Sequence, residues 1–80
     1  MAKNKTLVDL KPGENATIVG LTGESSENQR LMHMGIIDGA SVKFLRQAPS
    51  GDPIEISVMD YALSLRRDDA ARIIIEETND

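Results

Sequence analysis

The sequence contains no cysteine and no tryptophan, and it has one histidine, one phenylalanine and one tyrosine among its 80 residues. Without cysteine the chain forms no disulfide, thiolate zinc site, iron–sulfur cluster or cysteine nucleophile. Secreted domains of this size usually need disulfides for stability. The absence of disulfides therefore predicts a reducing compartment, the cytoplasm. Because His33 is the only histidine, metal sites that need two or more imidazoles are excluded as well.

Long apolar runs are also missing. No stretch approaches the ~20 apolar residues of a membrane-spanning helix, and residues 1–5 lack the apolar segment of a signal peptide. We therefore predict a soluble chain without direct membrane insertion. The formal net charge is −4, and because phosphate backbones attract the opposite sign, the charge disfavours nucleic-acid binding.

Hydrophobic residues make up 40% of the sequence, which is enough for a folded core. Because aromatic residues are scarce, this core must be largely aliphatic. The length predicts one domain, residues 1–80, with frayed ends at about 1–6 and 77–80.

One segment has helix signals at both ends. Ser26 is a good N-cap, and Gln29 three residues later would complete a capping box. At the other end Gly35 suits the left-handed residue that follows many helices. Leu31 and Ile36 are spaced as the apolar pair that accompanies a Schellman stop. Together these signals predict about two and a half turns of helix.

Short β-strands account for most of the remaining chain. We predict strands, separated by turn-forming residues, over 16–21, 41–46, 54–58, 61–65 and 72–76. The later connections are too short for parallel crossovers, so the sheet is antiparallel. The predicted fold is mainly β. It is a small antiparallel barrel of about five strands, with one short α-helix inserted after the first strand and a helical turn before the last.

No constellation of residues points to catalysis or to a cofactor. His33 has no ordered partner near it in the sequence and is a weak metal candidate. Gly35 and Gly39 are not followed by the Lys and Ser or Thr of a phosphate-binding loop, so we interpret them as backbone positions. The sequence therefore predicts a protein that is not an enzyme, needs no cofactor and works by binding another protein.

Two features suit a binding role. The Ala48–Pro53 loop contains two prolines and a glycine and projects between two strands. Loops on rigid scaffolds often bind partners, although a purely structural connection stays equally open. Arginine is enriched at protein interfaces. The candidates for partner contact are Arg30, Pro49, Ser50, Gly51, Asp52 and Arg66.

Three segments, in order, resemble the ferrous iron transport protein A (FeoA) family. Residues 30–40 (RLMHMGIIDGA) resemble its helix and turn, residues 48–54 (APSGDPI) its loop, and residues 63–75 its closing segment, which begins LSLR. Each piece alone is weak, but the ordered set is specific. The structural motif positions are Leu31, Gly35, Gly39, Pro53 and Leu65.

The resemblance implies an SH3-like barrel, which agrees with the strand count. It also implies a cytosolic accessory of ferrous iron uptake, whose partner is the cytosolic region of the FeoB transporter with its GTP-binding domain. The same fold occurs at the C-terminal end of iron-dependent repressors, but no DNA-binding segment precedes it here, which favours a stand-alone protein. Two alternatives stay open: a metal-responsive domain that binds a divalent ion through His33 and surface carboxylates, and pairing with a second copy through sheet edges.

Overall fold

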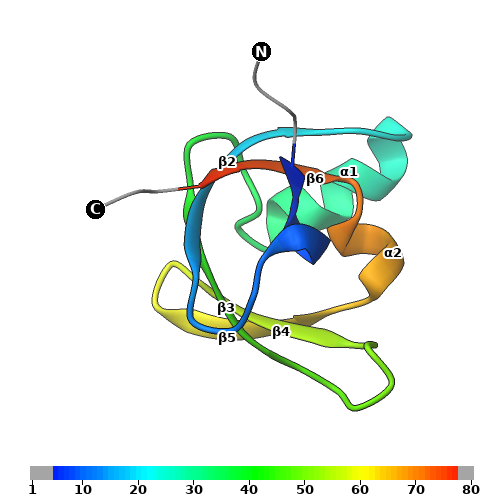
Figure 1. Ribbon diagram of the computed structural model, residues 1–80. Coiled ribbons are helices and arrows are strands. Elements are labelled where there is room, and N and C mark those ends of the chain that lie inside the picture. The colour runs from blue at the N-terminus through cyan, green and yellow to red at the C-terminus, as the bar shows by residue number, and fades with distance from the viewer. Residues whose placement is uncertain (1–4, 78–80) are drawn as a thin grey trace.

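The computed structural model describes residues 5–77. Six antiparallel strands form one sheet in the order β1-β6-β2-β3-β4-β5, which confirms the mainly β prediction. In Figure 1 the sheet curves, with β2 and β6 on one side, β3, β4 and β5 on the other, and α1 and α2 together on the right. The elements are β1 (Lys5–Thr6), η1 (Leu7–Asp9), β2 (Asn15–Leu21), α1 (Ser25–His33), β3 (Ser41–Gln47), β4 (Ile54–Val58), β5 (Tyr61–Leu65), α2 (Arg67–Ala70) and β6 (Ile73–Glu77).

The predicted frayed ends extend too far into the chain. Lys5 and Thr6 form β1 and pair with Ile75 and Ile74 of β6, and Glu77 is the last residue of β6. A two-residue strand has no periodicity of its own, so only its pairing with a strand distant in sequence reveals it. The other residues expected to fray lie outside the described part of the chain.

The predicted end of α1 is confirmed. Gly35 has a φ of +97°, and its N–H donates to the carbonyl of Met32 at 3.0 Å, while the N–H of Ile36 donates to that of Leu31 at 3.0 Å. These two bonds define a Schellman stop. Leu31 and Ile36 are both fully buried, as the apolar pair of that motif should be.

The predicted start of α1 is wrong. Glu24, not Ser26, is the N-cap, and no side-chain capping bond forms. The first helical turn is instead held by a distant residue, Arg72, whose Nη1 donates to Oδ1 of Asn28 at 2.8 Å and lies 3.4 Å from Oε1 of Glu27. A tertiary contact therefore takes the place of the local cap that the sequence suggests.

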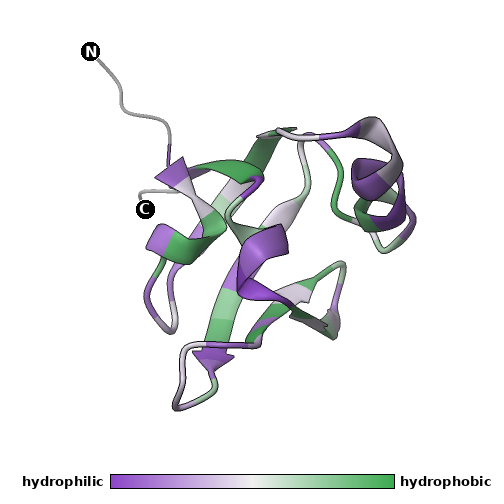
Figure 2. Cartoon of the chain, turned by 90° about the vertical axis from the view of Figure 1, so that its right-hand side faces the viewer, coloured by the Kyte–Doolittle hydropathy of each residue, from purple (hydrophilic) through white to green (hydrophobic). Residues whose placement is uncertain are grey.

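Alternating burial along the strands builds one aliphatic core. Val42 and Phe44 of β3 are buried and Lys43 between them is exposed, as predicted. Figure 2 shows this alternation of hydrophobic and hydrophilic residues along the strands. Met59 and Asp60 form the predicted two-residue turn between β4 and β5, with φ values of +52° and +70°. This turn fixes the register of β5 against β4, and so decides which β5 residues face α1.

Candidate protein-binding surface

Arg30 and Arg66, far apart in the sequence, lie on one hollow between α1 and β5. Arg30 is exposed on α1, and its Nη2 donates to Oδ2 of Asp69 at 3.1 Å. Asp69, a residue of α2, also accepts a bond of 2.7 Å from Nη2 of Arg72, so it holds Arg30 and Arg72 together. Arg66 connects β5 to α2, is exposed, and lines with Arg30 a cavity of about 190 Å³. Two of the predicted contact residues are thus neighbours in space.

The loop before β4 is held in shape by its own hydrogen bonds. The N–H of Gly51 donates to the carbonyl of Ala48 at 2.7 Å, and the N–H of Ala48 donates to that of Pro53 at 3.0 Å. The Ser50 hydroxyl donates to the carbonyl of Asp52 at 3.0 Å. The loop is therefore a fixed projection rather than a loose connection.

Asp52 docks this loop onto the start of α2. Its Oδ1 accepts the N–H of Arg67 at 2.9 Å, which satisfies one of the amides that every helix start leaves unpaired. Asp52, predicted for partner contact, makes this internal contact and is nevertheless exposed, as Pro49 and Ser50 are. The loop also lies beside the Arg67 side chain, whose Nη1 is 3.5 Å from the position of a Cβ added to Gly51. We refer to Arg30, Arg66 and Arg67 as the arginine surface.

Replacing Asp52 by alanine is expected to lower the free energy of unfolding by about 0.5–2 kcal/mol, the usual cost of losing a helix cap. Asp52→Asn is the matched control because its side-chain oxygen still accepts the Arg67 N–H. Urea denaturation of both variants measures the difference. Equal midpoints for the two variants would show that the cap contributes nothing.

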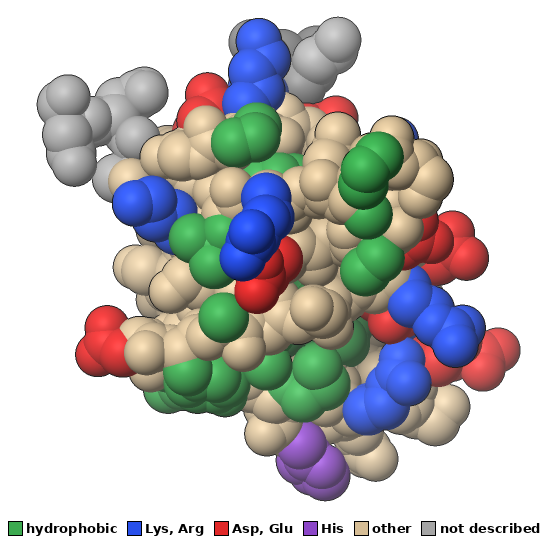
Figure 3. Space-filling model, turned by 90° about the horizontal axis from the view of Figure 1, so that it is seen from below, with side chains coloured by type: hydrophobic (Ala, Val, Ile, Leu, Met, Phe, Trp, Pro, Cys, Tyr) green, Lys and Arg blue, Asp and Glu red, His purple; other side chains and the backbone are tan. Residues whose placement is uncertain are grey.

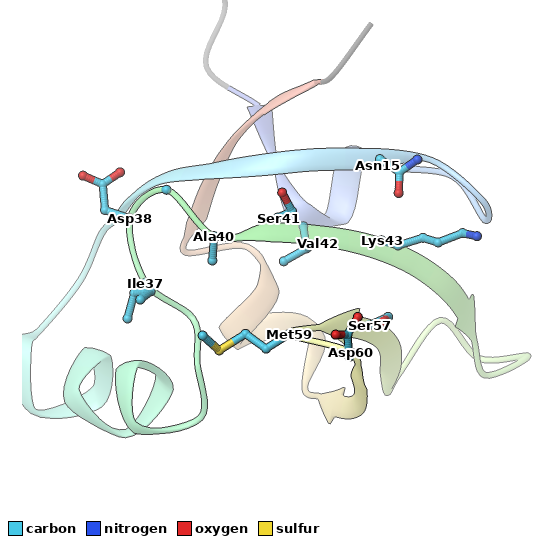
Figure 4. Close-up of a pocket in the computed structure, with 11 residues that line it drawn as sticks. Asn15, Ile37, Asp38, Ala40, Ser41, Val42, Lys43, Ser57, Met59 and Asp60 are labelled. Atoms are coloured by element: carbon cyan, nitrogen blue, oxygen red, sulfur yellow. The ribbon is translucent and has the colours of Figure 1, made fainter. Parts of the chain in front are cut away.

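A second exposed feature is an apolar patch formed by Ile37, Met59 and Tyr61, whose residues are 41%, 61% and 45% exposed. A Cβ atom added to Gly35 would lie 3.1 Å from Oη of Tyr61 and 3.2 Å from Sδ of Met59, so both side chains cover that glycine. The Tyr61 hydroxyl donates to the carbonyl of Met34 at 2.6 Å. In Figure 4 the Met59 side chain extends from its turn towards Ile37.

The apolar patch borders a depression of about 580 Å³ that Ile37 and Met59 help to line. Figure 3 shows hydrophobic side chains gathered on one face beside the histidine, with charged side chains around them. The sequence prediction missed this patch. Its one local signal is Met59, an apolar residue in a turn, where polar residues and glycine are usual.

His33 is exposed at the last position of α1. Within residues 5–77 no group of three or more His, Cys, Asp or Glu side chains is arranged to hold a metal ion. Over the same residues, no helix has the length and apolar character needed to cross a membrane.

The fold, together with the sequence motifs at residues 30–40, 48–54 and 63–75, agrees with one protein family. The family model of the FeoA domain matches residues 5–77. The chain belongs to the FeoA family. A fusion of Fe(2+) transport protein A with the Fe(2+) transporter FeoB, from Porphyromonas gingivalis, is 39% identical over 70 residues. That match covers 88% of this chain but only 8% of the fusion protein.

Solved structures of FeoA proteins share the fold. A FeoA-like protein from Clostridium acetobutylicum is 31% identical with a TM-score of 0.89, and the match covers 100% of this chain and 93% of that one. FeoA from Stenotrophomonas maltophilia, solved with zinc and described as a prokaryotic SH3 domain protein, is 22% identical with a TM-score of 0.78, over 90% and 89% of the two chains. At that identity the likeness concerns the fold alone, and it confirms the predicted SH3-like architecture.

Proposed function

We propose that this FeoA protein is a non-catalytic, cytoplasmic accessory of ferrous iron uptake that binds the cytosolic, GTP-binding region of FeoB. The observation that carries the proposal is the Porphyromonas fusion, in which the two proteins are parts of one chain. Tethered modules meet at a high effective concentration without any new contact between them. A natural tether of this kind supports the view that the separate proteins also work in contact.

The arginine surface gives the proposal a physical basis. Arg66 and Arg67 have no ion pair among the residues that the structure describes, although acidic residues outnumber basic ones in the chain. Arginine side chains form planar, bidentate bonds with carboxylates and are enriched at interfaces. A standard interface buries about 800 Å² per partner, a modest share of the 5274 Å² of accessible surface.

Titration calorimetry with the cytosolic region of FeoB tests the proposal. The titration is run with that region free of nucleotide, with GDP and with a non-hydrolysable GTP analogue. We expect saturable one-to-one binding in at least one of these states, with a Kd of roughly 1 μM, equivalent to about −8 kcal/mol. Absence of binding in all three states, with a FeoB region that binds nucleotide normally, would contradict the proposal.

A further inference from the structure

Within residues 5–77, strand β5 ends the sheet and has one edge without a strand partner. In a two-residue hairpin the residues that flank the turn, here Val58 and Tyr61, form a hydrogen-bonded pair. Because bonded and non-bonded pairs alternate, the pairs that Ala62 and Ser64 form with β4 are non-bonded. The N–H and C=O groups of Ala62 and Ser64 therefore point away from the sheet.

Both residues are exposed, and no backbone partner for them is found among residues 5–77. Their side chains are small, so an approaching backbone meets little obstruction. Edges of this kind are templates for a further strand, and many proteins protect them with a charge, a proline or a bulge. Neither Ala62 nor Ser64 supplies such protection.

Helix α1 lies across a cavity from the Ser64 end of this edge, and Ala62 lies beyond the residues that line it. Leu31 of α1, the C-cap residue Met34, and Ser64 and Leu65 of β5 line the same cavity of about 190 Å³, with Arg30 at its side. The bond between the Tyr61 hydroxyl and the Met34 carbonyl ties this helix to β5. The cavity is large enough for one or two side chains of an added strand, and its floor is apolar because Leu31 and Leu65 are buried.

The charge beside this cavity favours an acidic occupant. Arg66 follows β5 directly and lines the cavity, and Arg30 lies across from it on α1. Asp69 engages Arg30, but Arg66 has no ion pair among the described residues. A carboxylate on an incoming strand would meet Arg66 at the end of the edge.

We propose that the β5 edge binds an extended, acidic segment of the partner protein by strand addition, with Ala62 and Ser64 as its backbone contacts. The inference rests on the proposed function, since the partner would be FeoB. A second copy of this chain fits less well because its whole sheet would approach and meet α1, whereas a single strand is only about 5 Å wide. Strand addition at a groove between an edge strand and a helix is a recurring mode of peptide recognition.

Backbone variants of Ser64 test the contact directly. Ser64→Pro removes an N–H that points outwards and leaves the β4 ladder intact, because edge strands accept proline where no ladder bond is lost. Ser64→Val keeps the N–H and is the matched control. In titrations with the cytosolic region of FeoB we expect Ser64→Pro to weaken binding about tenfold and Ser64→Val to change it less than about twofold. Ala62→Pro makes the equivalent change two residues earlier if Ser64→Pro does not fold.

A peptide probe tests the edge without FeoB. An eight-residue peptide that alternates valine and glutamate is titrated into the isotopically labelled wild-type chain, and an alternating valine–lysine peptide is the control. We expect the glutamate peptide to shift the amide resonances of Ala62 and Ser64 in a saturable way, and the lysine peptide to leave them unchanged.

The outcomes separate the two proposals. FeoB binding that Ser64→Pro and Ala62→Pro leave unchanged overturns strand addition and keeps the proposed function. Glutamate-peptide binding at the edge without any FeoB binding keeps the strand-accepting edge and overturns the proposed function. If both peptides shift the Ala62 and Ser64 resonances equally, or if neither peptide shifts them, the acidic specificity of the edge is overturned.

Discussion

Replacing Gly35 by valine is expected to lower the free energy of unfolding by roughly 2–5 kcal/mol. Its φ of +97° is one that L-residues avoid, at a cost of about 1–2 kcal/mol. A side chain there would also crowd Tyr61 and Met59, whose nearest atoms lie 3.1 and 3.2 Å from the Cβ position. Crowding of this kind typically adds about 1–3 kcal/mol.

Gly39 provides the matched control for this prediction. Its φ is +92°, but no atom lies within 4 Å of an added Cβ, so Gly39→Val keeps the backbone strain and removes the crowding. We expect Gly35→Val to lower the Tm by about 4–8 °C more than Gly39→Val for each kcal/mol of difference. Equal losses would mean that Tyr61 and Met59 yield freely, and an unchanged Tm for Gly35→Val would mean that this glycine does not end α1.

Replacing Ile56 by alanine is expected to cost about 2–5 kcal/mol of unfolding free energy. Ile56 is fully buried at the centre of β4, opposite Phe44 of β3 and Leu63 of β5. Since strands hold it on both sides, the site has little room to collapse around the missing atoms.

Ile37→Ala removes the same atoms from a side chain that is 41% exposed, and we expect it to cost less than about 1 kcal/mol. Chemical denaturation of both variants gives the comparison. A near-neutral Ile56→Ala would indicate that the core does not pack around β4 as described.

The end of α1 and the turn between β4 and β5 could be predicted because each depends on residues that are close together in the sequence. The Schellman stop at Gly35 depends on residues 31–36, and the turn between β4 and β5 depends on the two residues Met59 and Asp60. Strand β1 and the start of α1 could not be predicted in the same way. The first exists only through its pairing with β6, and the second is set by contacts with Arg72.

For the candidate surface, too, the sequence predicted individual residues but not the contacts between distant segments. Residue type alone pointed to Arg30 and Arg66 as contact residues, but their common hollow is created by the packing of α1 against β5 and α2. The role of Asp52 at the start of α2 likewise depends on a contact between segments that are separate in the sequence. The apolar patch was missed because exposure of Tyr61 follows from its place in an edge strand, which the sequence does not state.

The affinity of this chain for the cytosolic region of FeoB tests the central claim most directly, measured for the wild type, Arg66→Glu and Lys11→Glu. Both variants reverse one exposed positive charge, and Lys11 lies in the turn before β2, outside the arginine surface. We predict saturable binding by the wild type and by Lys11→Glu within about twofold, and binding at least about tenfold weaker for Arg66→Glu. Absence of binding by the wild type, or equal affinities for all three proteins, would contradict the account.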